Sequence, residues 1–287
     1  VMTLLLVMQA IDSGRLRPDE MVTVSANAAG MGGSQVYLKE GEQMSVDDML
    51  KAVAVVSGND AAVALAEHLA GSEEAFVAQM NQKARELGMN DTCFVNCTGL
   101  PAAGHLTSAY DIALMSRALI AHSGIRKYTT IWMDSIRDGQ FQLSNTNKLV
   151  RFYEGTTGLK TGSTDSAGYC LSATAERGGM ELIAVVLKAD TSDQRFETAK
   201  SLLNYGFAAY TLMDVYPDQA LAPVDVLLGE QSTVQPVLSR SSRILIEKTA
   251  VDSVTTELRL CSDVEAPVEA GQTLGEMAVL VNGVEQQ

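Results

Sequence analysis

Hydrophobic spacing changes along this chain of 287 residues, and that change limits the folds it can adopt. Apolar residues in the first two hundred positions recur mostly at helical spacing. Two β-rich runs, 168–175 and 180–189, interrupt this pattern, and the Gly-containing turn between them should join them as a hairpin. Past Met213 only short alternating runs between Pro, Gly and Asp turns remain. We therefore expect a mixed helix and sheet domain over residues 1–212 and a β-rich domain over residues 213–287.

Serine caps indicate where several helices begin. Ser45 with Asp48 resembles a capping box and should open a helix that runs to Val56. A second helix should follow at once over residues 60–69, so Ser57-Gly58-Asn59 would lie in a tight connection between two helices. Ser72 can cap a further helix at 73–87, and Ser108 with Asp111 should start one at 108–121. The other expected elements are helices at 1–11 and 192–210, a strand at 21–24 and a loop at 26–34.

The net charge of −14 disfavours nucleic acid as a partner, because phosphate binding needs a basic patch. The acidic excess is unevenly placed. From Met213 onward there are 12 acidic and 4 basic residues, so the tail is the more acidic part for its size. This charge favours solubility and indicates nothing more specific.

No apolar run approaches the about 18 residues that a membrane span requires. The most apolar stretch, 1–11, has the length of a signal-peptide core. It lacks a basic leading segment and an A-x-A-like cleavage site, so a buried helix is the favoured interpretation.

The four cysteines do not form a disulfide framework in a chain of this size. Cys93 and Cys97 are close enough to suggest a metal site, but no second Cys or His pair stands at ligand spacing. We expect free thiols at Cys93, Cys97, Cys170 and Cys261 and no bound metal. The three histidines are scattered, and none is assigned to catalysis.

The Ser-Gly-Asn string between two helices has residue types that acyl transfer can use. Such a reaction needs a nucleophile, a proton acceptor, donors for the developing oxyanion and groups that hold the substrate. Ser57 could relay a proton to the leaving amine, and Asn59 could turn its amide toward a carbonyl of a bound peptide. The structural alternative is a polar cap between helices.

A Lys-Thr-Gly string should lie on the strand next to the hairpin. Lys160 offers a cation beside the Ser57 hydroxyl, and Thr161 can bond a carboxylate. Gly162 lets a substrate lie close against the strand, and the backbone N–H of Ser163 can serve as an oxyanion donor. Alone, the string could be a strand end that turns into a loop. The order and contexts of the two strings together favour an active site.

Five segments of the chain resemble the D-alanyl-D-alanine carboxypeptidases, the low-molecular-mass penicillin-binding proteins of the bacterial cell wall. The resemblance is greatest to the Gram-positive, sporulation-associated type and covers essentially the whole chain. The Ser-Gly-Asn and Lys-Thr-Gly strings would be the second and third motifs of such enzymes. The segments are residues 33–42, 57–61, 104–111, 145–147 and 158–162.

The resemblance implies an α/β fold of the serine β-lactamase and transpeptidase type, with an antiparallel sheet flanked by helices and a small all-β domain after it. It also implies a serine acyl-enzyme that removes the terminal D-Ala of peptidoglycan pentapeptide, with no metal or organic cofactor. β-Lactams would be covalent inhibitors of the full-length enzyme. Because peptidoglycan is extracytoplasmic, the mature protein should work outside the cytoplasmic membrane.

The family places an arginine that holds the terminal carboxylate of D-Ala at the position of Arg195. Guanidinium binds carboxylate in a planar bidentate fork, which suits that role. The structural alternative is an exposed cation near a helix start, beside Asp193 and Glu197.

The first motif of the family, Ser-x-x-Lys, supplies the nucleophile and is not found here. No Ser in the sequence is followed three positions later by Lys. The resemblance implies that Val1 would directly follow the Lys of that motif, so we expect an N-terminally truncated domain that is inactive as given. A membrane anchor would also need a segment outside these residues.

Two alternatives remain open. A class A-like β-lactamase would need a glutamate that activates water, and Glu86 superficially resembles it, although Gly88 marks a helix end there. Those enzymes also lack a β-rich tail. The other alternative is a non-catalytic peptidoglycan-binding remnant, which would account for the absent nucleophile.

Overall fold

The structure, a computed structural model, describes residues 1–240 and 242–286. Residues 1–177 and 181–204 form a first unit, and residues 178–180 with 205–286 form a second. The division near Met213 that the sequence suggests stays a prediction.

Serine side chains cap several helices of the first unit, among them α3 and α5, at the expected places. Ser45 Oγ accepts the N–H of Asp48 (3.1 Å), and Ser72 Oγ accepts the N–H of Ala75 (3.1 Å). The capped starts predicted from the sequence are therefore confirmed. The helices are α1 (Met2–Asp12), α2 (Ala26–Ala29), α3 (Val46–Val56), α4 (Asn59–Ala70), α5 (Glu73–Glu86), α6 (Ala109–Ile120), α7 (Arg126–Thr129), α8 (Leu149–Phe152) and α9 (Ser192–Ala209), with a 3₁₀ turn at Ser123–Ile125.

Helix α1 is buried on nearly every side, as its uniform apolar sequence predicts. Leu5 and Val7 are fully buried, and α1 packs against α3, α4, α5 and α6. Each of these helices turns an apolar face toward α1, so the hydrophobic core of the first unit surrounds it.

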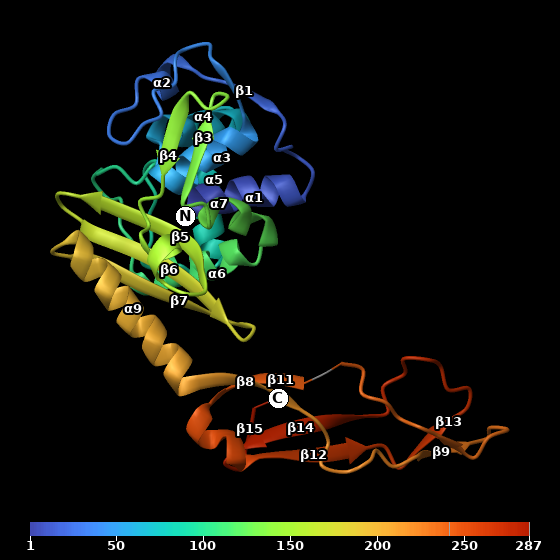
Figure 1. Cartoon of the computed structure of the whole chain (residues 1–287). Coiled ribbons are helices and arrows are strands. Elements are labelled where there is room, and N and C mark those ends of the chain that lie inside the picture. The colour runs from blue at the N-terminus through green and yellow to red at the C-terminus, as the bar shows by residue number, and fades with distance from the viewer. Residues whose placement is uncertain (241, 287) are drawn as a thin grey trace. The chain divides into compact units, whose positions relative to one another are not determined.

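A three-stranded sheet carries the predicted hairpin (Figure 1). Its strands are β5 (Thr156–Thr164), β6 (Gly168–Arg177) and β7 (Met180–Ala189), in the order β5-β6-β7. Strands β5 and β6 are antiparallel, so Gly162 lies opposite Cys170. The first turn of α9 contacts this sheet, because Arg195 donates to the carbonyls of Gly162 and Cys170. The helix-flanked antiparallel sheet expected for the first domain is confirmed.

Several local features differ from the sequence expectation, among them the short helices α7 and α8, which were not predicted. The stretch 26–34 contains the short helix α2, because Ser25 Oγ caps it by accepting the N–H of Ala28 (3.0 Å). A hairpin of β3 (Met133–Ile136) and β4 (Phe141–Ser144) was not predicted. Strand β1 (Met21–Thr23) pairs with β2 (Gln43–Ser45), and β2 was not predicted either.

The second unit is built from short strands, in agreement with the predicted β-rich tail. Its apolar core is small and consists of Val215, Ile244, Ile246 and Val279 with partly buried neighbours. The strands are β8 (Tyr210–Val215), β9 (Val224–Leu227), β10 (Thr233–Val234), β11 (Ser242–Glu247), β12 (Val254–Leu260), β13 (Asp263–Glu265), β14 (Gly275–Val281) and β15 (Val284–Glu285), with a 3₁₀ segment at Lys248–Ser253.

Across residues 1–240 and 242–286, none of the helices has both the length and the apolar character needed to cross a bilayer.

Candidate active site

Ser57 ends helix α3 in a left-handed conformation. Its φ of 61° and ψ of 37° are uncommon for a residue with a side chain, and such conformations concentrate at functional sites. The turn is held because the N–H groups of Ser57 and Gly58 both donate to the carbonyl of Ala52. Helix α4 begins at Asn59, so the string does lie in a tight helix-to-helix connection. The half-buried Ser57 hydroxyl is thereby fixed outside both helices.

Lys160 on β5 meets Ser57 across 103 residues of sequence. Its Nζ donates to Ser57 Oγ and to the carbonyl of Thr161 (3.0 Å). Burial, and to a lesser extent the nearby Arg195 cation, lowers the pKa of Lys160 to about 8. The two strings recognised in the sequence therefore share one site, which contains an ammonium whose pKa is well below that of an ordinary lysine.

Burial, and to a lesser extent the charge of Lys160, lowers the pKa of the Val1 α-amino group to about 5. In the view of Figure 1 the N-terminus is drawn near strand β5.

Asn59 is held by the loop before α3. Its N–H donates to the carbonyl of Ser34 (2.8 Å), and its Nδ2 donates to the carbonyl of Gly32 (2.8 Å). One amide proton is thereby used within the protein, and Oδ1 and the second proton remain for a ligand. Gly33, with φ +77°, permits this approach, because a Cβ there would lie 2.8 Å from Asn59 Nδ2.

Asp60 anchors the same loop, a role that the sequence reasoning missed. The carboxylate is fully buried and accepts the N–H groups of Val36 (3.0 Å), Leu38 (3.0 Å) and Ala61 (2.9 Å). Three backbone donors replace the water that the charge has lost. The only sequence signal was its place directly after Asn59.

Thr161 is buried, and its hydroxyl lies 2.6 Å from the hydroxyl of Thr146. Gly162, the next residue on β5, is exposed, and a Cβ built there would have no neighbour within 4 Å. The strand therefore presents an open stretch of backbone beside the Thr161 hydroxyl. Ser163 follows on the same strand, is exposed, and lies opposite Tyr169.

Arg195 is 7% exposed, which contradicts the alternative of a surface cation. Its Nη1 donates to the carbonyls of Gly162 (3.2 Å) and Cys170 (3.3 Å). The guanidinium lies over the ring of Phe196, 4.7 Å from its centroid, and burial lowers the pKa of Arg195. Within residues 1–240 and 242–286 its buried Nε has no hydrogen-bond partner.

Together these residues form a cationic site with hydroxyl donors. Lys160 and Arg195 supply positive charge, and Ser57 and Thr161 supply hydroxyl groups that can donate or accept. Such a set can hold a carboxylate and move a proton to or from a neighbouring group.

The remaining candidates lie outside this arrangement. Glu86 is exposed at the end of α5 and bonds Lys83 (2.5 Å) and Gln82 (3.0 Å). All four cysteines are free thiols, as expected. In the part of the chain that the structure describes, no three His, Cys, Asp or Glu side chains are grouped as a metal site would require.

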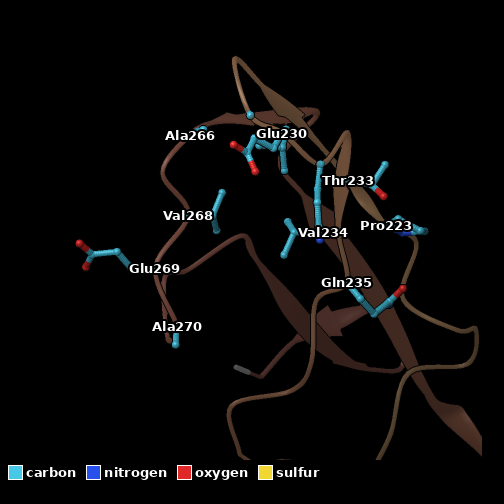
Figure 2. A pocket seen from close by; sticks show the side chains of 12 residues that line it. Pro223, Glu230, Thr233, Val234, Gln235, Ala266, Val268, Glu269 and Ala270 are labelled. Atoms are coloured by element: carbon cyan, nitrogen blue, oxygen red, sulfur yellow. The ribbon is translucent and has the colours of Figure 1, made fainter.

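A hollow of about 610 Å³ belongs to the second unit. Figure 2 shows Val234 and Val268 among the side chains that line it, with Glu269 turned outward. Its lining combines apolar, neutral polar and acidic side chains and has no cation, so it lacks the positive charge found around Lys160.

The chain is similar to known proteins over nearly its whole length. A family model described as D-alanyl-D-alanine carboxypeptidase matches residues 1–191, and one described as penicillin-binding protein 5, C-terminal domain, matches residues 210–285. The D-alanyl-D-alanine carboxypeptidase DacF of Bacillus subtilis is 42% identical, and the alignment covers 99% of this chain and 74% of that protein.

Solved structures show the same likeness. Penicillin-binding protein 5 of Haemophilus influenzae has a TM-score of 0.82 and 30% identity, with 100% of this chain and 85% of that one covered. Penicillin-binding protein D2 of Listeria monocytogenes in its cefotaxime-bound form has a TM-score of 0.65 and 35% identity, with 72% and 84% covered.

Proposed function

The chain belongs to the D-alanyl-D-alanine carboxypeptidase family, and on that premise we propose that its two motifs form the substrate site of a serine-type carboxypeptidase. The enzyme removes the terminal D-Ala of peptidoglycan pentapeptide through an acyl-enzyme, outside the cytoplasmic membrane. The observation that carries this proposal is the hydrogen bond from Lys160 to Ser57, which joins two strings 103 residues apart.

Each site residue has one role in the proposal. Ser57 and Lys160 move a proton toward the leaving amine, since a hydroxyl bonded to an ammonium of lowered pKa can relay it. Asn59 orients the peptide with its free amide groups. The peptide lies along the open backbone at Gly162.

The end of the substrate is held by the other residues. Thr161 and Arg195 bind the terminal carboxylate, because both approach Gly162 and the buried Arg195 retains an unused Nε donor. The backbone N–H of Ser163 donates to the oxyanion of the tetrahedral intermediate.

The attacking serine belongs to a Ser-x-x-Lys segment upstream of Val1 in this proposal. One observation supports it: no Ser in the sequence is followed three positions later by Lys. The serine adds to the peptide carbonyl, D-Ala leaves with a proton, and water then hydrolyses the ester.

Labelling with a fluorescent penicillin tests the proposal. A protein extended upstream to include the Ser-x-x-Lys segment should give a covalent adduct and release D-Ala from a pentapeptide, while the 287-residue chain should give no adduct. The matched control is the extended protein with that serine replaced by alanine.

The other outcomes are equally informative. An adduct on the 287-residue chain would show that the nucleophile lies within it. An extended protein that binds peptide but forms no adduct would favour the non-catalytic peptidoglycan-binding alternative, and rapid penicillin turnover would favour a β-lactamase.

A further inference from the structure

The loop between β4 and α8 is fixed by two buried asparagines. Asn145 donates its N–H to the carbonyl of Trp132 (2.9 Å), and its Oδ1 accepts the N–H of Asn147 (2.8 Å). Asn147 Oδ1 in turn accepts the N–H of Leu149 (3.1 Å). Thr146 stands between these asparagines with an exposed side chain. Its position is therefore set by the backbone on both sides.

Thr146 touches both halves of the candidate site. Its N–H donates to the carbonyl of Val55 (3.1 Å), two residues before Ser57 at the end of α3. Its hydroxyl lies 2.6 Å from the hydroxyl of Thr161 on β5. One residue thus connects the helix turn with the strand, although neither string contains it.

The proton count of the two hydroxyls decides what Thr161 can offer a ligand. Each hydroxyl has one proton to donate, so the bond between them uses only one of the two. If Thr161 donates to Thr146, it has no proton left for a carboxylate. If Thr146 donates, the Thr161 proton is free.

The alternative acceptor for Thr146 is poorly placed. Its hydroxyl lies 3.5 Å from the carbonyl of Val55, at the outer limit of a hydrogen bond, and that carbonyl already accepts the Thr146 N–H. The 2.6 Å contact with Thr161 is much shorter. A carboxylate, which only accepts, would draw the Thr161 proton outward and leave Thr146 as the donor.

We propose that Thr146 is a positioning residue that donates its hydroxyl proton to Thr161 and so directs the Thr161 proton to the substrate carboxylate. This inference rests on the proposed function only in taking Thr161 as a carboxylate ligand. The proposed role of Thr146 predicts that the site prefers a C-terminal carboxylate to an uncharged carboxamide. A carboxylate can only accept the Thr161 proton, whereas a carboxamide N–H can itself donate to Thr161.

Equilibrium binding to the 287-residue chain tests the inference without turnover. The probes are diacetyl-L-Lys-D-Ala-D-Ala and its C-terminal carboxamide, with dissociation constants taken from NMR titrations. The Thr146→Val variant keeps the shape and the backbone N–H but loses the hydroxyl. It should bind the carboxylate peptide about three- to tenfold more weakly, the effect of one lost hydrogen bond, with unchanged carboxamide binding.

Two further variants separate positioning from a general structural effect. Thr146→Ser restores a hydroxyl and should recover most of the carboxylate affinity. Thr107→Val is the matched control, because it removes a hydroxyl from the exposed Thr92–Thr107 pair (2.9 Å) and should change neither affinity.

Several results would overturn the inference. Thr146→Val could weaken the binding of both peptides equally, or the binding of neither. Thr146→Ser could fail to restore the affinity for the carboxylate peptide, or the unmodified chain could fail to bind that peptide at all. Failure of the proposed function would give a different result. The extended protein would form no acyl-enzyme, while the NMR titrations would still show selectivity for the carboxylate peptide.

Discussion

The two units of this molecule bury different kinds of side chain. Every buried polar or charged side chain within residues 1–240 and 242–286 belongs to the first unit, including Asn59, Asp60, Thr161 and Arg195. The second unit buries only a small apolar core and carries its charges outside, as in the group that Arg259 forms with three glutamates.

The interior of the first unit therefore contains polar groups that can take part in function, while the interior of the second unit is apolar and only stabilises the fold. A buried polar group destabilises a protein unless it is hydrogen-bonded, and exposed ion pairs contribute little. The first unit meets that requirement at Asp60, whose carboxylate accepts three N–H groups, whereas Nε of the buried Arg195 has no hydrogen-bond partner among the described residues. We infer that chemistry is concentrated where polar groups are buried, and the predictions below test this difference between the two units.

The largest effect should come from the cation of the site. In the extended, active protein Lys160→Met should lower kcat/KM by about 10²- to 10⁴-fold, because proton transfer and carboxylate attraction are both lost. Lys248→Met in the second unit is the matched control, since Lys248 is exposed and donates to the carbonyl of Phe207. The rate of pentapeptide hydrolysis gives kcat/KM for both variants. An equal loss of kcat/KM in the two variants would contradict the inference that chemistry is confined to the first unit.

Core packing should give the next effect. Leu119→Ala removes a fully buried side chain of α6 and should lower the free energy of unfolding by about 2–5 kcal/mol. Leu245→Ala removes a side chain that is 58% exposed on β11 and should change it by less than about 0.5 kcal/mol.

Urea unfolding can follow each unit. The single tryptophan, Trp132, lies in the first unit and reports on it by fluorescence, while circular dichroism follows the whole chain. If Leu245→Ala lowered the free energy of unfolding as much as Leu119→Ala, the second unit would be packed as tightly as the first.

The smallest effect should be a pH dependence of ligand binding. With the pKa of Lys160 lowered to about 8, the protonated fraction and hence the affinity for a carboxylate peptide should fall about tenfold from pH 7 to pH 9. Lys160→Arg keeps the charge and should flatten the profile. An unmodified chain whose affinity stays constant over this range would contradict the lowered pKa.

The lowered pKa of Lys160 affects stability in the opposite direction to binding: raising the pH weakens carboxylate binding but should increase the free energy of unfolding. The ordinary pKa of lysine is 10.5, so between about pH 8 and 10.5 the unfolded chain binds more protons than the folded one. The contribution of Lys160 to the free energy of unfolding should therefore rise with pH across that window.

Local signals predicted much of the fold. Ser45 and Ser72 indicated helix starts because a cap depends on residues only three positions away. The hairpin of β6 and β7 was visible because its turn is short and rich in Gly. Ser57 was placed correctly between two helices for the same reason.

Apart from the contact of Lys160 with Ser57, which the two strings together suggested, long-range contacts were not predictable. The β3–β4 hairpin was missed because its strands are four residues each and give little periodicity. Asp60 accepts a hydrogen bond from Val36, which is 24 residues away, and Thr146 bonds Thr161, which is 15 residues away. Neither partner could be identified from the local sequence. Arg195 was suggested by resemblance alone, since nothing in its local sequence indicates that it would be buried beside Gly162.

The most direct test is a crystal structure of the 287-residue chain with diacetyl-L-Lys-D-Ala-D-Ala bound. The terminal carboxylate should lie within about 3.2 Å of the Thr161 hydroxyl and the Arg195 guanidinium, with the peptide along Gly162. A peptide bound elsewhere, for example in the hollow of the second unit, and not along Gly162 would contradict the account.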